Sequence, residues 1–229
     1  MSTAQTKTYD SYHFGSPSGV TDRQLKQLIR FFNLPKDSIN SALGGRTSIT
    51  VVRLEDIGSV VIKYYRRGGA IRYLIKQRYI KCGKTRCQIE YELLQKVRSF
   101  GINAPEPIAF AYRGRLLYQC WLVTREIKHH QTLAQLSCLN EEQARMVMKE
   151  VIKQVSTLIK NKILHVDLHP GNVIVDNQNQ VYLLDFDKGS IFHGGKNALR
   201  RRYLRRWHRA IQKHGLPEML SEINDFNYL

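Results

Sequence analysis

His165-Val166-Asp167-Leu168-His169-Pro170-Gly171-Asn172 is the most informative segment of this 229-residue chain. It places a carboxylate and an amide, Asp167 and Asn172, five residues apart, and the Pro-Gly pair between them favours a tight loop. A second segment, Leu183-Leu184-Asp185-Phe186-Asp187, follows after a short turn and brings another carboxylate. A carboxylate that accepts a hydroxyl proton and oxygen ligands for Mg²⁺ are the groups that phosphoryl transfer from ATP requires.

The spacing of these residues is typical of kinases. Asp167 and Asn172 stand as in the kinase catalytic loop H-R-D-x-x-x-x-N, and Asp185 takes the place of the metal-binding Asp of D-F-G. An ordinary surface turn and a metal site made of His165 and His169 are the alternatives. The Pro-Gly pair argues against the helix that such a histidine pair needs, and Val166 stands where a helical zinc motif requires Glu. We therefore predict Asp167 as the catalytic residue and Asn172 and Asp185 as the metal ligands.

Two residues upstream fit the nucleotide site of a kinase. Lys63 lies in the β-branched segment 59–65, and Glu90 follows 27 residues later in a helical segment. An ion pair between them would aim the lysine at the α- and β-phosphates of ATP. Gly44 and Gly45 precede the β-branched segment 47–54. Their backbone N–H groups are candidates for capping phosphates, although a plain turn explains these glycines nearly as well.

Strand patterns dominate the first half of the chain and helical patterns the second half. Strands are expected at 47–54, 59–65, 108–112, 116–125, 172–176 and 181–187, and helices at 21–33, 85–99, 196–214 and after a cap at Asn140. This order predicts an α+β fold with two lobes. The expected divisions are a mobile leader over residues 1–20, a β-rich N-terminal lobe over 21–128 and a helical C-terminal lobe over 129–229.

The charge of the chain is concentrated in two places. Lys and Arg number 36 against 19 Asp and Glu, and the net charge of +17 indicates an anionic partner. Seventeen bases fall in two segments without an acid, 63–86 and 196–214. The N-terminus lacks a signal-peptide pattern and no apolar run is long enough for a membrane span, so we expect neither a secreted nor an integral membrane protein. The four cysteines include no C-x-x-C pair and are expected to be reduced thiols. Cys82 and Cys87 would form half of a zinc site at most, because no second Cys/His pair with ligand spacing follows.

Four segments together resemble the lipopolysaccharide core kinases of the protein-kinase-like fold, above all the 3-deoxy-D-manno-octulosonic acid (Kdo) kinases. They are VVIKYYRRGG (60–69), IEYELLQKVRSFGINAPEP (89–107), HVDLHPGN (165–172) and LLDFDKGS (183–190). The resemblance covers about residues 44–210. It implies a two-lobed fold with a β-rich N-lobe and a reduced helical C-lobe, and transfer of the ATP γ-phosphate to a sugar hydroxyl of the lipopolysaccharide inner core.

The resemblance also implies roles for individual residues. Asp167 would be the catalytic base, Asn172 and Asp185 would hold Mg²⁺, and Lys63 with Glu90 would bind ATP. The acceptor would be Kdo-lipid A or the lipopolysaccharide inner core, at the cytoplasmic face of the inner membrane, where the protein would bind peripherally.

In this interpretation the basic residues would bind the acceptor and its membrane, because both are anionic. Arg66 and Arg67 are candidates for contacting the acceptor, although both fit solvated loop residues as well. In the segment 196–214, Arg202, Arg205, Arg206 and Arg209 share a face opposite Trp207, so this helix would either bind the membrane or only pack on the C-terminal lobe. No nucleic-acid partner is expected.

Three other functions remain open. The chain would be a heptose kinase or another small-molecule kinase of the same fold, or a protein kinase of a small atypical kind, or a pseudokinase that only binds anionic surfaces. Val166 replaces the Arg of H-R-D and only 42 residues follow Asp187 without an A-P-E segment, so a protein substrate is not favoured. The strongly basic charge argues against an aminoglycoside-type phosphotransferase.

Overall fold

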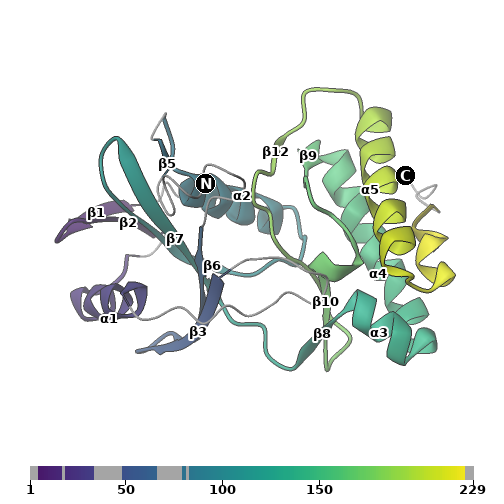
Figure 1. Ribbon diagram of the computed structural model, residues 1–229, viewed down its shortest axis with the longest axis horizontal. Coiled ribbons are helices and arrows are strands. Elements are labelled where there is room, and N and C mark those ends of the chain that lie inside the picture. The colour runs from purple at the N-terminus through teal and green to yellow at the C-terminus, as the bar shows by residue number, and fades with distance from the viewer. Residues whose placement is uncertain (1–4, 17–18, 34–47, 66–78, 81–82, 225–229) are drawn as a thin grey trace. The chain divides into compact units, whose positions relative to one another are not determined.

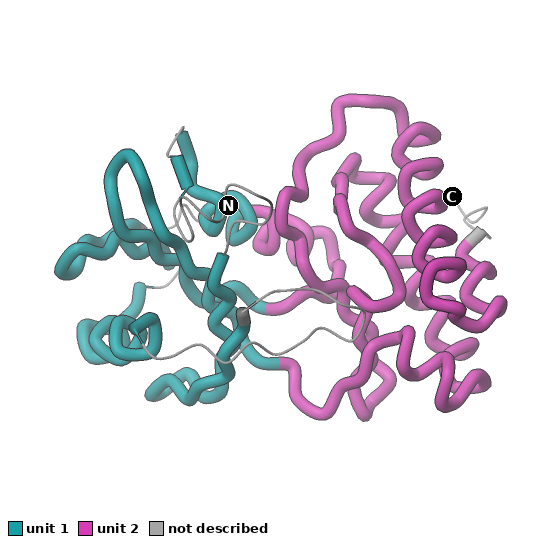
Figure 2. The backbone as a smooth tube through the Cα atoms, in the orientation of Figure 1, with its two compact units in different colours: residues 1–92, 106–126 teal, residues 93–105, 127–229 magenta. Residues whose placement is uncertain are grey.

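The computed structural model describes residues 5–16, 19–33, 48–65, 79–80 and 83–224. The chain forms two compact units, which Figure 2 colours separately. The first unit comprises residues 1–92 and 106–126, and the second comprises 93–105 and 127–229. The mixed sheet and helix content agrees with the predicted α+β class. Residues 93–105 belong to the second unit. The sequence-based division at residues 128 and 129 had placed them in the N-terminal lobe.

The first unit is built on an antiparallel sheet with the strand order β1-β2-β6-β7-β4-β3, and β5 also pairs with β7 (Figure 1). Its strands are β1 (Gln5–Tyr9), β2 (Tyr12–Ser16), β3 (Ser48–Leu54), β4 (Gly58–Tyr64), β5 (Tyr79–Ile80), β6 (Pro107–Arg113) and β7 (Leu117–Arg125). The predicted hairpin is present, with Leu54 opposite Gly58 across a tight turn. β4 lies between β3 and β7, which places Lys63 in an interior strand.

The first two strands correct the expectation of a mobile leader over residues 1–20. β1 and β2 form a hairpin, and β2 continues the sheet by pairing with β6. Tyr12 and Phe14 are each only 2% exposed, because alternate positions of β2 face the core. Gly15 lies so close to the Phe110 ring that a Cβ would approach it to 2.2 Å, which explains a glycine inside this strand.

Helix α1 (Asp22–Phe32) covers part of the sheet core and confirms the predicted helix at 21–33. Thr21 and Gln24 form a reciprocal capping box at its start. The helix buries Leu25, Leu28 and Phe32 in the core of the first unit, where the Phe32 ring stacks on Trp121 at 4.7 Å. This aromatic packing stabilises the sheet that carries Lys63.

The second unit is mainly helical. Its helices are α3 (Leu133–Leu139), α4 (Glu141–Lys160), α5 (Lys196–His214) and the 3₁₀ turns η2 (Pro170–Asn172) and η3 (Glu218–Asn224). Its short strands are β8 (His130–Thr132), β9 (Ile163–Leu164), β10 (Val173–Asp176), β11 (Val181–Leu183) and β12 (Ser190–Ile191). They form the sheet β11-β10-β8 and the pair β12-β9. Helix α2 (Arg86–Ser99) begins in the first unit and ends in the second.

The predicted helices of this part of the chain are confirmed. Helix α4 begins after Asn140, whose side chain accepts a hydrogen bond from the Gln143 N–H at 3.0 Å. Helix α5 occupies the predicted residues 196–214 and ends at Gly215, which has a left-handed conformation. No helix among the described residues combines the length and the apolar character needed to cross a bilayer.

Candidate active site

The loop that carries the predicted catalytic residue lies between β9 and β10 and is anchored by His165. The buried His165 ring packs on Phe186 at 4.6 Å, and its Nε2 donates to the Leu184 carbonyl at 2.7 Å. The His165 backbone N–H donates to the Tyr203 hydroxyl of α5 at 2.9 Å. The start of the loop is therefore fixed both to the Asp185 segment and to the C-terminal helix.

The structure brings Asp167 and Asn172 together. The Asn172 amide nitrogen donates to the Asp167 carbonyl at 2.8 Å, which closes the loop across the predicted five-residue spacing. The 3₁₀ turn η2 lies between them, and the His169 ring caps it by accepting from the Gly171 N–H at 3.1 Å. The Asp167 carboxylate is 45% exposed, so a substrate hydroxyl has access to it.

Asp185 is tied to the same loop through the backbone. The Leu184 N–H donates to the Asn172 carbonyl at 2.8 Å, directly before Asp185, and β10 pairs with β11. Asp185 itself has a positive φ of 61°, a conformation that Asp adopts more readily than most residues. A left-handed residue at this point turns the chain out of the strand direction.

These residues fit a Mg²⁺ ion that nucleotide phosphates help to bind. The Asn172 amide nitrogen is committed to Asp167, which leaves its oxygen as the group that can face a cation. Asp185 adds a carboxylate, and Mg²⁺ is usually held by one or two such side chains together with phosphates and water. Among the described residues, no three His, Cys, Asp or Glu side chains gather as a metal cluster.

An arginine of α5 also contacts the predicted base. The Arg206 Nε donates to Asp167 Oδ1 at 2.7 Å, and Nη2 donates to the same oxygen. This finding corrects the sequence-based grouping of Arg206 with the acceptor- or membrane-facing arginines of the helix. Arg202, Arg205 and Arg209 are exposed, whereas Arg206 is part of the candidate site.

The same surroundings act on His169. Its side chain is 12% exposed, and burial first of all lowers the pKa of His169 from 6.5 to about 4. The nearby Asp167 opposes this change, while Arg206 adds to it. His169 is therefore neutral near pH 7, as its role of accepting the Gly171 N–H at Nδ1 requires.

In the first unit the structure forms the predicted pair of Lys63 and Glu90. The Lys63 Nζ lies 2.9 and 3.0 Å from the two Glu90 carboxylate oxygens. The side chains are 15% and 4% exposed, so the pair is largely desolvated. Removing one partner of such a pair leaves an uncompensated buried charge.

Tyr65 completes this cluster and was not predicted. Its hydroxyl donates to Glu90 Oε2 at 2.5 Å, and burial together with the Glu90 charge raises the pKa of Tyr65 well above its usual value. The tyrosine is thus a neutral donor that helps to hold the Glu90 carboxylate. Its only signal in the sequence is its position two residues after Lys63, on the same face of an extended strand.

For Arg206, the signal in the sequence is the spacing of the apolar residues of α5. Leu199, Tyr203 and Ala210 are buried, and Arg206 continues their i, i+4, i+7, i+11 pattern. A charged residue within an apolar helix face calls for a buried or half-buried partner. The remaining predicted site residues, Gly44, Gly45, Arg66 and Arg67, lie outside the described residues, as does Cys82.

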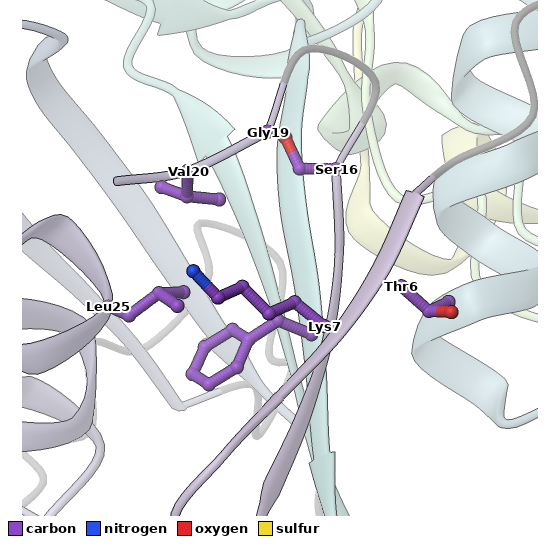
Figure 3. Close-up of a pocket in the computed structure, with 7 residues that line it drawn as sticks. Thr6, Lys7, Ser16, Gly19, Val20 and Leu25 are labelled. Carbon is purple, nitrogen blue, oxygen red and sulfur yellow. The ribbon is translucent and has the colours of Figure 1, made fainter. Parts of the chain in front are cut away.

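A pocket of about 230 Å³ lies in the first unit between the β1–β2 hairpin and α1, and none of the candidate residues lines it (Figure 3). Phe14, Val20 and Leu25 give it an apolar lining. The ammonium of Lys7, which also lines the pocket, is paired with Asp22.

Comparison with known proteins identifies relatives. A 3-deoxy-D-manno-octulosonic acid kinase of Xylella fastidiosa (strain M23) is 30% identical over 151 residues, which cover 65% of this chain and 59% of the relative. Proteins of the same name from Vibrio vulnificus (strain YJ016) and Vibrio cholerae are 31% identical over 187 residues and 29% identical over 180 residues. These two alignments cover 79% and 75% of this chain, and 74% of each relative.

The alignment thus spans about three-fifths of the length of the Xylella relative. The model of the lipopolysaccharide kinase (Kdo/WaaP) family matches residues 30–223, a range that includes Lys63, Glu90, Asp167, Asn172 and Asp185. Because this match covers most of the chain, the protein belongs to the lipopolysaccharide kinase (Kdo/WaaP) family.

Proposed function

We propose that the protein is an ATP-dependent kinase that phosphorylates a sugar hydroxyl, that of Kdo, in the inner core of Kdo-lipid A or lipopolysaccharide. The observation that carries this proposal is the closed loop in which Asn172 binds the Asp167 backbone while the Asp167 carboxylate remains accessible. The names of the relatives support Kdo as the acceptor.

Asp167 acts as the base in this proposal. Its carboxylate accepts the proton of the sugar hydroxyl as the hydroxyl oxygen attacks the γ-phosphorus of ATP, and ADP leaves. Asn172 and Asp185 would hold Mg²⁺, which would offset the charge of the nucleotide phosphates when bound. The hydrogen bonds from the His165 ring to the Leu184 carbonyl and from the Leu184 N–H to the Asn172 carbonyl keep these side chains in fixed relation to one another.

Lys63 binds the α- and β-phosphates of ATP in this proposal. Glu90 orients the ammonium, because both of its oxygens contact Nζ, and Tyr65 in turn orients Glu90. Gly44 and Gly45 would add backbone N–H groups to the phosphate site. Double contacts of this kind restrict a flexible lysine side chain, which lowers the entropic cost of binding phosphate.

The acceptor and the membrane account for the basic charge. Kdo carries a carboxylate and lipid A carries phosphates, both of which arginine binds well. We infer that Arg66 and Arg67 contact the acceptor and that the protein binds peripherally at the cytoplasmic face of the inner membrane. Exposed Arg202, Arg205 and Arg209 of α5 are suited to an anionic lipid surface.

Mass spectrometry of the acceptor tests this proposal. Purified Kdo-lipid A and a heptose-extended inner core are each incubated with the protein, ATP and Mg²⁺, and fragment ions locate any added phosphoryl group. We expect one phosphoryl group on Kdo, and none without Mg²⁺ or with the Asp185→Ala variant. Phosphorylation of heptose alone would identify a heptose kinase, and the absence of transfer to either acceptor would favour the pseudokinase alternative.

A further inference from the structure

The contact between Arg206 and Asp167 has an unusual form. The Arg206 Nε and Nη2 both donate to Oδ1 of the carboxylate, so the guanidinium binds one oxygen twice and does not bridge the two. The other oxygen, Oδ2, lies 3.9 Å from His169 Nε2, which is beyond hydrogen-bond distance. The two carboxylate oxygens are therefore not equivalent.

We propose that Arg206 is a positioning residue that holds Oδ1 of Asp167 and thereby directs Oδ2 toward the acceptor hydroxyl. This inference rests on the proposed kinase function. In it, the hydroxyl proton passes to Oδ2 as the oxygen attacks the phosphorus, and Arg206 touches neither substrate.

Asp167 needs such a partner. The terminal torsion of an aspartate is broad, so a half-exposed carboxylate rotates freely unless a neighbour fixes it. The hydrogen bond from Asn172 fixes only the backbone of Asp167 and leaves the side chain free to turn. The planar, permanently charged guanidinium supplies the missing constraint on the carboxylate.

Helix α5 holds Arg206 firmly enough for this task. Three residues before it, the Tyr203 hydroxyl donates to the Ile163 carbonyl and accepts from the His165 N–H. Directly after it, Trp207 is fully buried and its Nε1 donates to the Leu220 carbonyl at 2.9 Å. The helix is thus fixed to the catalytic loop at the same level as Arg206.

Steady-state kinetics with a soluble, delipidated Kdo acceptor test the role, because this acceptor removes any effect on membrane binding. Arg206→Gln should lower kcat by about 10- to 100-fold through loss of orientation, with little change in the KM for ATP. Arg206→Lys keeps the positive charge but lacks the rigid, planar set of guanidinium donors, so it should give an intermediate kcat. Arg201→Gln is the matched control: Arg201 lies on the same helix, is exposed and has no ion pair within the described part of the chain, so kcat should stay within about twofold of wild type.

Chemical rescue separates positioning from a structural role. Guanidinium at millimolar, non-denaturing concentration should restore part of the kcat of Arg206→Ala, and should not restore Asp167→Asn. A folded Arg206→Gln with a wild-type kcat would overturn the proposal. Loss of folding in both the Gln and Ala variants, or no rescue of a folded Arg206→Ala, would make the residue structural and would also overturn it.

The same assay distinguishes this inference from the proposed function. If the wild-type protein is active and Arg206→Gln is equally active, only the role of Arg206 is refuted. A wild-type protein that transfers no phosphoryl group to the acceptor refutes the proposed function, and the role of Arg206 with it.

Discussion

At the scale of single residues, Asp167 gives the most direct test of the chemistry. Asp167→Asn keeps an oxygen for Arg206 and the shape of the side chain, but an amide cannot accept the hydroxyl proton. We expect kcat to fall by about 10²-fold or more, because a positioned base contributes roughly that factor. ATP binding and the melting temperature should change little. Turnover within a few fold of wild type would remove Asp167 from the mechanism.

The Mg²⁺ ligands are tested separately through nucleotide affinity. Asn172→Ala and Asp185→Ala each remove an oxygen ligand of a hard cation, so ATP should bind more weakly in the presence of Mg²⁺. Titration of ATP affinity against Mg²⁺ concentration measures the effect, with Asn177→Ala in the exposed turn between β10 and β11 as the control. Wild-type Mg²⁺ dependence in both variants would contradict the assignment.

His169 makes stability depend on pH. The folded protein holds the pKa of His169 at about 4, below its usual value of 6.5, so the unfolded chain takes up a proton first as the pH falls. The contribution of His169 to the free energy of unfolding is fully present above pH 6.5 and is lost as the pH falls from 6.5 to about 4. A separation of one pH unit between the two pKa values corresponds to about 1.4 kcal/mol. Urea unfolding should therefore show a steeper loss of stability over this range for wild type than for His169→Gln, and equal slopes would refute the role of His169.

Several residues of the site could be predicted because their chemistry and their order in the chain are both distinctive. Lys63 and Glu90 are ordinary residues one by one, and only their order before Asp167 made the ion pair a sensible prediction. Arg206 was grouped with its neighbours because arginines surround it in the sequence, and only its place on the apolar face of the helix distinguishes it from them. Its partner is 39 residues away, and only the folded loop brings the carboxylate to it.

At the scale of elements, the tie between α5 and the catalytic loop is the next test. Tyr203→Phe removes a buried hydroxyl that serves both Ile163 and His165. The loss of partners for buried backbone groups should cost about 1–3 kcal/mol of unfolding free energy and should also lower kcat, because the loop loosens. Tyr182→Phe is the control, since within the described part of the chain the Tyr182 hydroxyl makes a single long contact, of 3.4 Å, with Asp176. Its unfolding free energy should change by less than about 0.5 kcal/mol.

Long elements with a clear period were predicted well, whereas among the short ones β10 and β11 were predicted and the β1–β2 hairpin was not. Helices α1, α4 and α5 have capping or periodic apolar residues, which are local signals. The β1–β2 hairpin was taken for a mobile leader because its glycine and hydroxyl residues hide the alternation of Tyr12 and Phe14. Its stability comes from pairing with β6, about a hundred residues later in the chain, which no local pattern reveals.

At the scale of the whole molecule, the net charge of +17 raises the question of what the bases bind. Arg206 is occupied by Asp167, so a test of membrane binding must leave it intact. The exposed Arg202, Arg205 and Arg209 are the suitable set, because they lie on α5 outside its apolar face. Replacing all three with Gln preserves helix propensity reasonably well.

Each base near an anionic bilayer contributes about 1 kcal/mol, so the triple variant should bind phosphatidylglycerol vesicles roughly 10²-fold more weakly in a co-sedimentation assay. Wild-type binding should weaken as salt rises, because the Debye length shrinks to about 8 Å at physiological ionic strength. Turnover of the delipidated acceptor should remain near that of wild type. A control with Lys128, Lys149 and Lys160 changed to Gln removes the same charge from exposed sites outside α5. If both variants lose vesicle binding equally, the net charge and not α5 attracts the membrane, and if neither does, the role of anchoring the protein passes to the bases of 63–86.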